Sequence, residues 1–206
     1  MPSLILIAGP NGAGKSTSSA SLLEKFGIKA FDYDFEFNSH WKVFSFDPIV
    51  EQGVRDTVTE IFLEQKNISL KNKTNFAFET NYHHSSVVKF VDDFTSAGFI
   101  THLIFLCLPN EQVAMERVRN RVLKGGHPVD QETIHERFEK GLTQLDGTFD
   151  KFDLVSLFLS EEYGAKRIAW LQPKLKKVGI FNPIPNSIKQ SLPRLEKFIQ
   201  LHKQEP

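Results

Sequence analysis

A glycine-rich loop near the start of the chain carries the clearest chemical pattern. The run from Gly9 to Thr17 fits G-x-x-x-x-G-K-[ST], directly after an apolar run typical of a buried strand and directly before residues typical of a helix. In such a loop successive backbone N–H groups converge on phosphate oxygens, and the following helix presents its positive end to the same anion. The sequence therefore predicts a site for a nucleoside triphosphate, which we expect to be ATP, although the loop alone does not select the base.

Within this loop, Lys15 is expected to reach the β- and γ-phosphates, and the Ser16 hydroxyl is expected to be a ligand of Mg²⁺. The predicted nucleotide-binding residues are Gly9, Pro10, Asn11, Gly12, Ala13, Gly14, Lys15, Ser16 and Thr17.

Three carboxylates follow predicted strands. Asp32 and Asp34 come after the second apolar run, and Glu79 comes after the third, whereas the fourth ends in Leu108-Pro109 without an acid. Ligands of open parallel sheets lie beyond the carboxyl ends of the strands, so we expect these acids near the phosphate loop. There a carboxylate holds Mg²⁺ or accepts the proton of an attacking hydroxyl. Taken singly, each acid is equally well explained as a cap or turn residue.

A cluster of cations lies in the second half of the chain. Arg117, Arg121 and Lys124 share one stripe of a predicted helix, which ends at Gly125-Gly126, and Arg137 lies on the next helix. Two helices joined by a glycine hinge predict a lid whose guanidinium groups close on transferring phosphoryl oxygens. Ordinary exposed arginines remain the alternative. We interpret His127, beside the hinge, as a turn residue rather than a lid contact.

Apolar runs alternate with segments of helical periodicity, which is typical of an α/β protein with a mainly parallel sheet. The predicted strands span residues 4–8, 28–31, 75–78, 101–108 and 154–159. The predicted helices span residues 15–26, 48 to about 65, 85–97, 110–123 and a segment that begins at 130, the last two capped by Asn110 and Asp130. A hairpin at 165–180 and an amphipathic helix with apolar residues Ile188, Leu192, Leu195 and Ile199 close the chain.

Composition limits the class of protein. The 206 residues are 40% hydrophobic and 24% charged, as in ordinary globular proteins, and no apolar run is long enough for a bilayer. We therefore expect one domain over 1–206, with a core at 1–160 and a C-terminal hairpin and helix at 165–206. The N-terminal apolar run lacks a basic stretch and is interpreted as a strand, not a signal peptide. The single cysteine, Cys107, fits a buried position and a reducing, cytoplasmic location.

The net charge is zero, but the charges are unevenly distributed. Residues 166–206 contain nine basic and two acidic side chains. Such a segment is able to dock a polyanion, although a solvated surface explains it more simply. Because no run of alternating aromatic and basic residues accompanies the lysines, the sequence argues against nucleic acid as a partner.

The combination of motifs resembles the zeta-toxin-like P-loop kinases. The matching segments are Gly9 to Thr17, Asp32-Tyr33-Asp34, Phe76-Ala77-Phe78-Glu79-Thr80, and Arg117-Val118 with Arg121-Val122 and Gly125-Gly126-His127. The resemblance covers roughly residues 4–159. It implies a P-loop NTPase fold with α/β/α layers, a five-stranded, mainly parallel sheet and a glycine-hinged helical lid.

The resemblance also implies a reaction: ATP- and Mg²⁺-dependent phosphorylation of a hydroxyl on a uridine-diphosphate amino sugar. Asp34 would be the general base, supported by Asp32. Glu79 and Thr80 would meet the substrate, with Glu79 also near Mg²⁺. Arg121 and Arg137 match the lid arginines, and an antitoxin protein becomes a candidate partner. The arginine usual after the Asp-x-Asp element is absent, because Phe35-Glu36-Phe37 follows.

The motifs also bear on three alternatives to this kinase. A transporter-type ATPase predicts a Leu-Ser-Gly-Gly-Gln signature and a strand-terminal Asp-Glu pair, and the sequence contains neither. A nucleotide-binding ATPase, or a decayed toxin–antitoxin module without acceptor kinase activity, stays open. A polynucleotide kinase also stays open because of the basic C-terminal segment.

Overall fold

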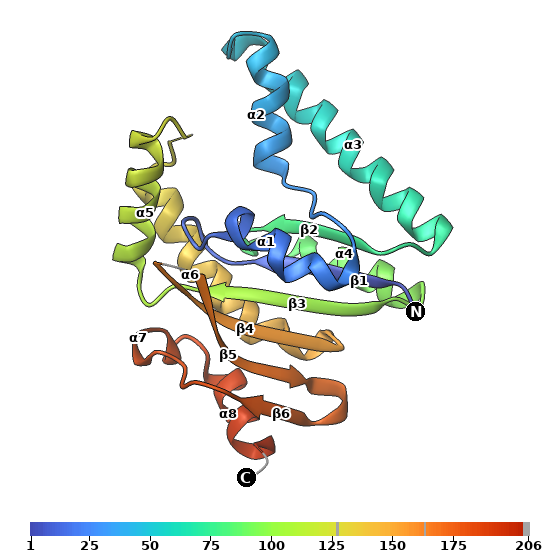
Figure 1. Cartoon of the computed structure of the whole chain (residues 1–206), viewed down its shortest axis with the longest axis vertical. Coiled ribbons are helices and arrows are strands. Elements are labelled where there is room, and N and C mark those ends of the chain that lie inside the picture. Colours follow the sequence, from blue (N-terminus) through green and yellow to red (C-terminus); the bar gives the residue numbers. More distant parts are fainter. Residues whose placement is uncertain (127, 163, 204–206) are drawn as a thin grey trace.

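A single sheet organises the described part of the chain, residues 1–126, 128–162 and 164–203, in this computed structural model (Figure 1). Its six strands lie in the order β2-β1-β3-β4-β5-β6. Strands β1 to β4 run parallel, and β5 and β6 add antiparallel neighbours at one edge. The strands are β1 Ser3–Ala8, β2 Phe76–Thr80, β3 Ile100–Cys107, β4 Leu154–Glu161, β5 Gly164–Gln172 and β6 Lys177–Ile180. The predicted α/β class, parallel core and C-terminal hairpin are confirmed.

The predicted strand at 28–31 is wrong. Only Phe31 pairs with the sheet, through a single bridge to Phe78, in which the Phe31 N–H donates to the Ala77 carbonyl at 2.8 Å. The reason lies in the next residue. Asp32 caps helix α2 (Tyr33–Val43), with its Oδ1 accepting a hydrogen bond from the Phe35 N–H at 3.1 Å. The chain therefore leaves the sheet as soon as it has touched it, and the expected five-stranded parallel arrangement becomes four parallel strands plus a hairpin.

The helices cover both faces of the sheet. They are α1 Lys15–Leu23, α2 Tyr33–Val43, α3 Glu51–Asn72, α4 Ser86–Ser96, α5 Glu111–Leu123, α6 Gln131–Thr148, α7 Asn186–Lys189 and α8 Pro193–His202. Figure 1 shows α1 on the near side of the sheet and α4 and α6 on the far side, which is the predicted three-layer arrangement. None of the described helices is long and apolar enough to cross a membrane.

The caps of the two helices that follow β3 are those that the sequence predicts. Asn110 Oδ1 accepts from the Val113 N–H at 3.0 Å, and Asp130 Oδ1 accepts from the Thr133 N–H at 2.8 Å. The C-terminal amphipathic segment differs from expectation, because Pro193 starts a new helix and splits the segment into α7 and α8. A proline tolerated only in a first turn explains this break.

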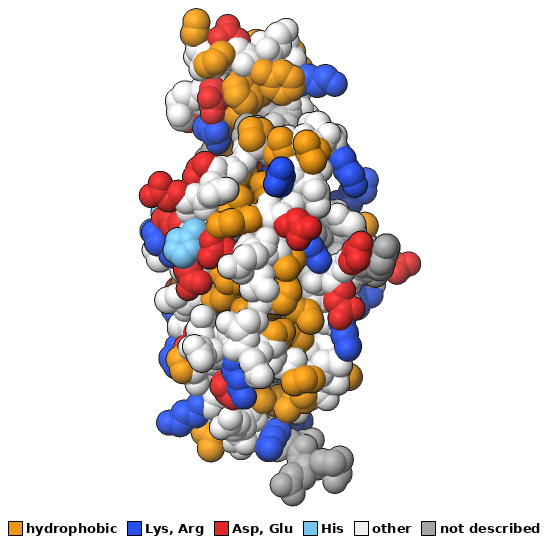
Figure 2. All heavy atoms as spheres, turned by 90° about the vertical axis from the view of Figure 1, so that its left-hand side faces the viewer, with side chains coloured by type: hydrophobic (Ala, Val, Ile, Leu, Met, Phe, Trp, Pro, Cys, Tyr) orange, Lys and Arg blue, Asp and Glu red, His pale blue; other side chains and the backbone are white. Residues whose placement is uncertain are grey.

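Helices α2 and α3 form an arm that projects from the sheet (Figure 1). The Tyr33 hydroxyl donates to the Arg55 carbonyl at 2.9 Å and so ties α2 to α3 near the base of the arm. Apolar side chains gather at the far end, at the top of Figure 2, where Val43 and Ile49 are 78% and 90% exposed. Helix α3 is longer than the predicted segment, which stopped near residue 65.

A phenylalanine cluster holds α3 and α4 against β2. The Phe62 ring stacks on Phe90 with centroids 5.2 Å apart, and the Phe76 ring stacks on Phe94 at 5.8 Å. On the next strand but one, Cys107 is buried as predicted, and burial raises the pKa of its thiol to about 12. Aromatic packing thus fixes the strand that ends in Glu79.

A buried histidine links α1 to the sheet. The His102 ring on β3 lies edge-on to Phe26, with centroids 6.3 Å apart, and its Nε2 shares a hydrogen bond of 3.0 Å with the Ser156 hydroxyl on β4. Burial, with smaller contributions from the positive charges of Lys25 and Arg167, lowers the pKa of His102 to about 3. The imidazole is therefore neutral in the folded protein at all ordinary pH values.

This histidine predicts acid sensitivity. Because the pKa of His102 is lowered by folding, the unfolded chain takes up a proton below about pH 6.5 that the folded chain does not, and stability falls as pH decreases. We expect the free energy of unfolding to drop by about 2 kcal/mol more in the wild type than in His102→Gln between pH 7 and pH 5. Urea unfolding at both pH values measures this difference. Equal losses in the two proteins would contradict it.

Candidate active site

The phosphate loop connects β1 to α1 and contains three positions whose backbone conformation favours glycine. Gly9, Gly12 and Gly14 have positive φ angles of 148°, 79° and 77°. A Cβ atom on Gly9 would lie 2.5 Å from the Leu106 carbonyl oxygen, a distance that atoms do not tolerate. The loop is therefore curled tightly against β3, with its amides and the N-terminus of α1 on the open side, which is the arrangement that binds phosphate groups.

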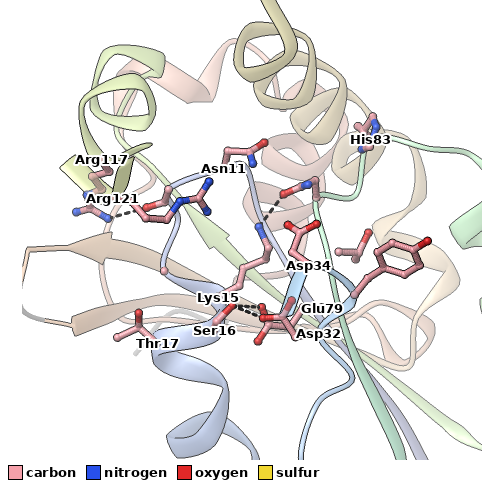
Figure 3. Close-up of a pocket in the computed structure, with 15 residues that line it drawn as sticks. Asn11, Lys15, Ser16, Thr17, Asp32, Asp34, Glu79, His83, Arg117 and Arg121 are labelled. Atoms are coloured by element: carbon pink, nitrogen blue, oxygen red, sulfur yellow. Dashed lines mark hydrogen bonds between the residues drawn. The ribbon is translucent and has the colours of Figure 1, made fainter. Parts of the chain in front are cut away.

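Lys15 lies across this loop. Its Nζ donates to the carbonyl oxygens of Gly9 at 2.8 Å and Pro10 at 3.1 Å, and to Asn81 Oδ1 at 2.8 Å (Figure 3). Burial lowers the pKa of Lys15 to about 8, against the opposing attraction of nearby carboxylates. A bound phosphate would pair directly with the Lys15 ammonium and so compensate for the hydration that this group loses by burial.

Asn81 is a site residue that the sequence reasoning missed. It stands two positions after Glu79 at the carboxyl end of β2, so the strand-end argument used for the acids applies to it equally. The next residue, Tyr82, holds this segment in place: it has a positive φ of 58°, is fully buried, and shares a hydrogen bond of 2.8 Å between its hydroxyl and that of Thr148.

Two carboxylates converge on the Ser16 hydroxyl. Its Oγ lies 2.6 Å from Asp32 Oδ2 and 2.7 Å from Glu79 Oε2, although a hydroxyl has one hydrogen to donate (Figure 3). Burial first, and then the negative charge of Asp32, raises the pKa of Glu79, while the Ser16 hydrogen bond opposes this rise. The two carboxylates therefore lack a proton or a cation that would balance their negative charges.

This donor set fits Mg²⁺. Magnesium prefers oxygen ligands and is commonly held by one or two carboxylates together with substrate phosphates and water. The hydroxyl of Ser16 and the carboxylates of Asp32 and Glu79 supply such oxygens at the edge of the phosphate loop. Within the described residues, no group of three or more His, Cys, Asp or Glu side chains could hold a metal without a substrate. We therefore expect metal and nucleotide to bind together.

Asp34 lies in the first turn of α2, and its carboxylate faces the same cavity as Lys15 (Figure 3). Its negative charge acts on Lys15, which confirms that the two groups are near each other. Thr80 also lines the cavity, but its Oγ1 accepts a hydrogen bond of 3.0 Å from the Tyr82 N–H. Capping by Asp32 thus directs Asp34 toward the loop.

The predicted lid arginines are held at different places. The Arg117 guanidinium is held by two hydrogen bonds: it donates to Ser160 Oγ at 2.7 Å and to the Gly12 carbonyl at 3.3 Å. Arg121, one turn further along α5, lines the cavity. Arg137 on α6 donates to Asn11 Oδ1 at 3.3 Å. All three arginines therefore reach the phosphate-loop region.

The lid itself stays a prediction. Helix α6 is fixed near its end, where Thr148 contacts Tyr82 and Gln144 Nε2 donates to the His84 carbonyl at 2.6 Å. Arg117 attaches α5 to the phosphate loop, so both helices of the predicted lid contact the core. His127 lies outside the described residues, so the expectation for it is untested.

The candidate site is a cavity of about 480 Å³ between the phosphate loop, α2, α5 and the end of β2. His83 lines it as well and was not predicted; burial and the charge of Arg137 lower its pKa. The lining residues are Asn11, Gly12, Gly14, Lys15, Ser16, Thr17, Asp32, Tyr33, Asp34, Glu79, Thr80, Asn81, His83, Arg117 and Arg121. Lys124 lies beside a neighbouring cavity instead.

Comparison with known proteins supports this architecture. A family model described as an AAA domain (AAA_33) matches residues 4–143. No curated protein matches the chain. Among solved structures, the chain is similar to the PezAT chromosomal toxin–antitoxin system of Streptococcus pneumoniae, with a TM-score of 0.62 and 14% identity over 100% of this chain and 88% of that chain.

The chain is also similar to two crystal structures of AvrRxo1-ORF1:AvrRxo1-ORF2. One contains sulphate ions and gives a TM-score of 0.65, and the other contains ATP and gives 0.60, each at 12% identity over 93% of this chain. This chain spans 63% of the length of the chain that it matches in both. At these identities the likeness concerns the fold, and it confirms the fold expected from the resemblance to zeta-toxin-like P-loop kinases.

The carboxylate pair predicts a metal-dependent affinity for ATP. Because Glu79→Gln removes one charged oxygen from the predicted Mg²⁺ ligands, we expect ATP to bind about tenfold more weakly in the presence of Mg²⁺. Binding in EDTA should change little. Titration calorimetry under both conditions separates the two contributions, with Asp34→Asn as a carboxylate control that keeps the Mg²⁺-dependent part. An equal loss with and without Mg²⁺ would show that Glu79 does not serve the metal.

Proposed function

We propose that this chain, which belongs to the AAA-domain family, is an ATP- and Mg²⁺-dependent kinase that transfers the γ-phosphoryl group to a hydroxyl. One observation carries the proposal: the Asp34 carboxylate faces the cavity that also holds Lys15 and the phosphate loop. A carboxylate at this place would accept the proton of an attacking hydroxyl, whereas a site that only bound nucleotide would have no need of it.

The residues divide the work between binding and proton transfer. Backbone amides of the loop and Lys15 hold the β- and γ-phosphates, and Mg²⁺ held by Ser16, Asp32 and Glu79 would neutralise charge on the phosphate oxygens. The acceptor oxygen forms a bond to the γ-phosphorus while the bond from that phosphorus to the β–γ bridging oxygen breaks. The hydroxyl proton passes to Asp34, and ADP leaves.

Arginines supply the remaining positive charge. Arg121 and Arg137 approach the loop from α5 and α6, where their planar donors suit the three equatorial oxygens of the transferring group. Arg117 has a different role, because its donors already meet Ser160 and Gly12; it positions α5 on the phosphate loop.

For the acceptor, we propose a uridine-diphosphate amino sugar, and for a partner, an antitoxin protein. The resemblance to zeta-toxin-like kinases supports both, and the similarity of fold to a toxin–antitoxin system supports the partner. Phe35, which stands where the family carries an arginine, is 67% exposed. An aromatic side chain thus follows Asp34 where the family carries a cation.

The acceptor is tested directly. The protein is incubated with labelled ATP and a panel of sugar nucleotides, nucleosides and oligonucleotides, and the products are identified by mass. A product heavier by one phosphoryl group than a uridine-diphosphate amino sugar supports the proposal. Phosphate release without any phosphorylated acceptor would instead favour an ATPase.

The role of Asp34 predicts a separation of catalysis from binding. Asp34→Asn removes the proton acceptor but adds no bulk, so we expect phosphoryl transfer to fall by about 10²- to 10⁴-fold while the Kd for ATP changes less than about threefold. Glu36→Gln, a carboxylate on the same helix outside the cavity lining, is the matched control and should keep full activity. Full turnover by Asp34→Asn would remove the proposed general base.

A further inference from the structure

One face of β4, β5 and β6 carries aromatic and basic side chains from segments that are far apart in the sequence. We call it the open face and define it by residues Phe158, Arg167, Trp170, Lys177, Gly179 and Phe181. Its orientation follows from the register. Ser156 bonds His102 beneath Phe26 at the end of α1, and Ser156 pairs with Trp170 across the strands. The open face therefore lies on the α1 side of the sheet.

Helix α8, which follows these strands in the chain, lies on the opposite side of the sheet. Helix α8 packs against α6: the Leu195 N–H donates to Asp146 Oδ1 at 2.8 Å, and the rings of Phe149 and Phe198 are 5.3 Å apart. Because α6 covers the far side in Figure 1, α8 lies there too, whereas α1 lies on the near side over the first strands. In the part of the chain that the structure describes, Figure 1 shows no helix over the near side of β5 and β6.

These side chains form an ordered platform. The Arg167 guanidinium lies 5.6 Å from the ring centroid of Phe158 and 5.2 Å from that of Phe181, and Phe181 is 54% exposed. The Trp170 indole lies flat on Gly179, where a Cβ atom would come within 2.2 Å of its Nε1. A glycine at this position is therefore required for the indole to lie against the sheet.

The platform is positively charged. Lys177 pairs with Gln172 beside Trp170, and Lys25 at the end of α1 acts on His102 together with Arg167. In the described part of the chain, no ion pair neutralises Lys25, Arg167 or Lys177, whereas other basic residues of the C-terminal segment do have acidic partners. Three cations near one exposed ring, Phe181, and two half-buried rings, Phe158 and Trp170, fit a polyanion that also has planar groups.

We propose that the open face binds single-stranded nucleic acid. Unpaired bases stack on aromatic rings and on guanidinium planes, and phosphates pair with Lys and Arg, which is the chemistry of sequence-tolerant single-strand binding. A paired duplex hides its bases from such a platform. An apolar protein surface fits less well, because it would bury Arg167 and Lys177 without partners.

The open face also adjoins the candidate active site. Phe158 lies two residues before Ser160, whose hydroxyl accepts a hydrogen bond from Arg117 at the phosphate loop. A single-stranded nucleic acid lying along β4 would therefore reach the opening of the cavity. The binding proposed here does not depend on kinase activity and is measured without ATP.

Anisotropy of fluorescein-labelled dT12 tests the proposal with the full chain at 50 mM salt. We expect saturable binding that a twelve-base-pair duplex competes for poorly, and a fall in affinity with salt that indicates at least two phosphate contacts. In a Trp41→Phe background, Trp170 is the remaining tryptophan, and its fluorescence should be quenched by unlabelled dT12.

Variants identify the surface. Arg167→Ala and Lys177→Ala should each weaken dT12 binding at least fivefold, and Gly179→Ala, which displaces the indole, should reduce the quenching. Lys197→Ala on the exposed side of α8 is the matched control and should bind as the wild type does. Thermal melting confirms that each variant is folded.

Several results would overturn the proposal. These are an absence of dT12 binding at 100 µM protein, an equal loss in Lys197→Ala, or concentration-dependent dimerisation that Arg167→Ala abolishes, which would make a second copy the occupant. Failure of the kinase proposal would leave the binding result standing.

Discussion

The arrangement of the site depends on one electrostatic constraint: a lysine ammonium and two carboxylates are brought together where parallel strands end. Lys15 is held by carbonyl and amide oxygens, and Ser16 joins Asp32 to Glu79. Burial works against charge on both sides, since it lowers the pKa of Lys15 and raises that of Glu79. A bound metal ion together with polyphosphate would offset both effects. The metal ion places positive charge beside the carboxylates, and the phosphates place negative charge beside Lys15.

The same constraint explains why the surrounding packing is so fixed. Phe62 and Phe90 hold the strand that ends in Glu79, and Tyr82 is buried in a left-handed conformation directly after Asn81. On the other side, Arg117 attaches α5 to the phosphate loop through Gly12. Charged groups that neutralise one another must be placed to within a fraction of their contact distance. Helices and strands hold their side chains in place more precisely than loops do.

Local patterns predicted much of this architecture. The glycine loop, the caps at Asn110 and Asp130 and the C-terminal hairpin each depend on a few neighbouring residues, and the structure confirms all of them. The prediction of a strand at 28–31 was wrong because no helix was expected to start at Asp32, although its Oδ1 caps α2. Asn81 escaped notice because a neutral amide gives no charge signal in a sequence.

The open face was missed for a different reason, which concerns topology rather than pattern. Phe158, Arg167 and Trp170 come together through strand register, with a bulge between Leu157 and Phe158 that realigns the next pair. A search for aromatic and basic residues alternating along the chain cannot detect residues that alternate across strands. The sequence argument against a nucleic-acid partner considered alternation along the chain only, so it does not address the surface proposed here. Strand β4 serves both surfaces. Its Phe158 belongs to the open face, and its Ser160 accepts a hydrogen bond from Arg117, which also contacts the phosphate loop.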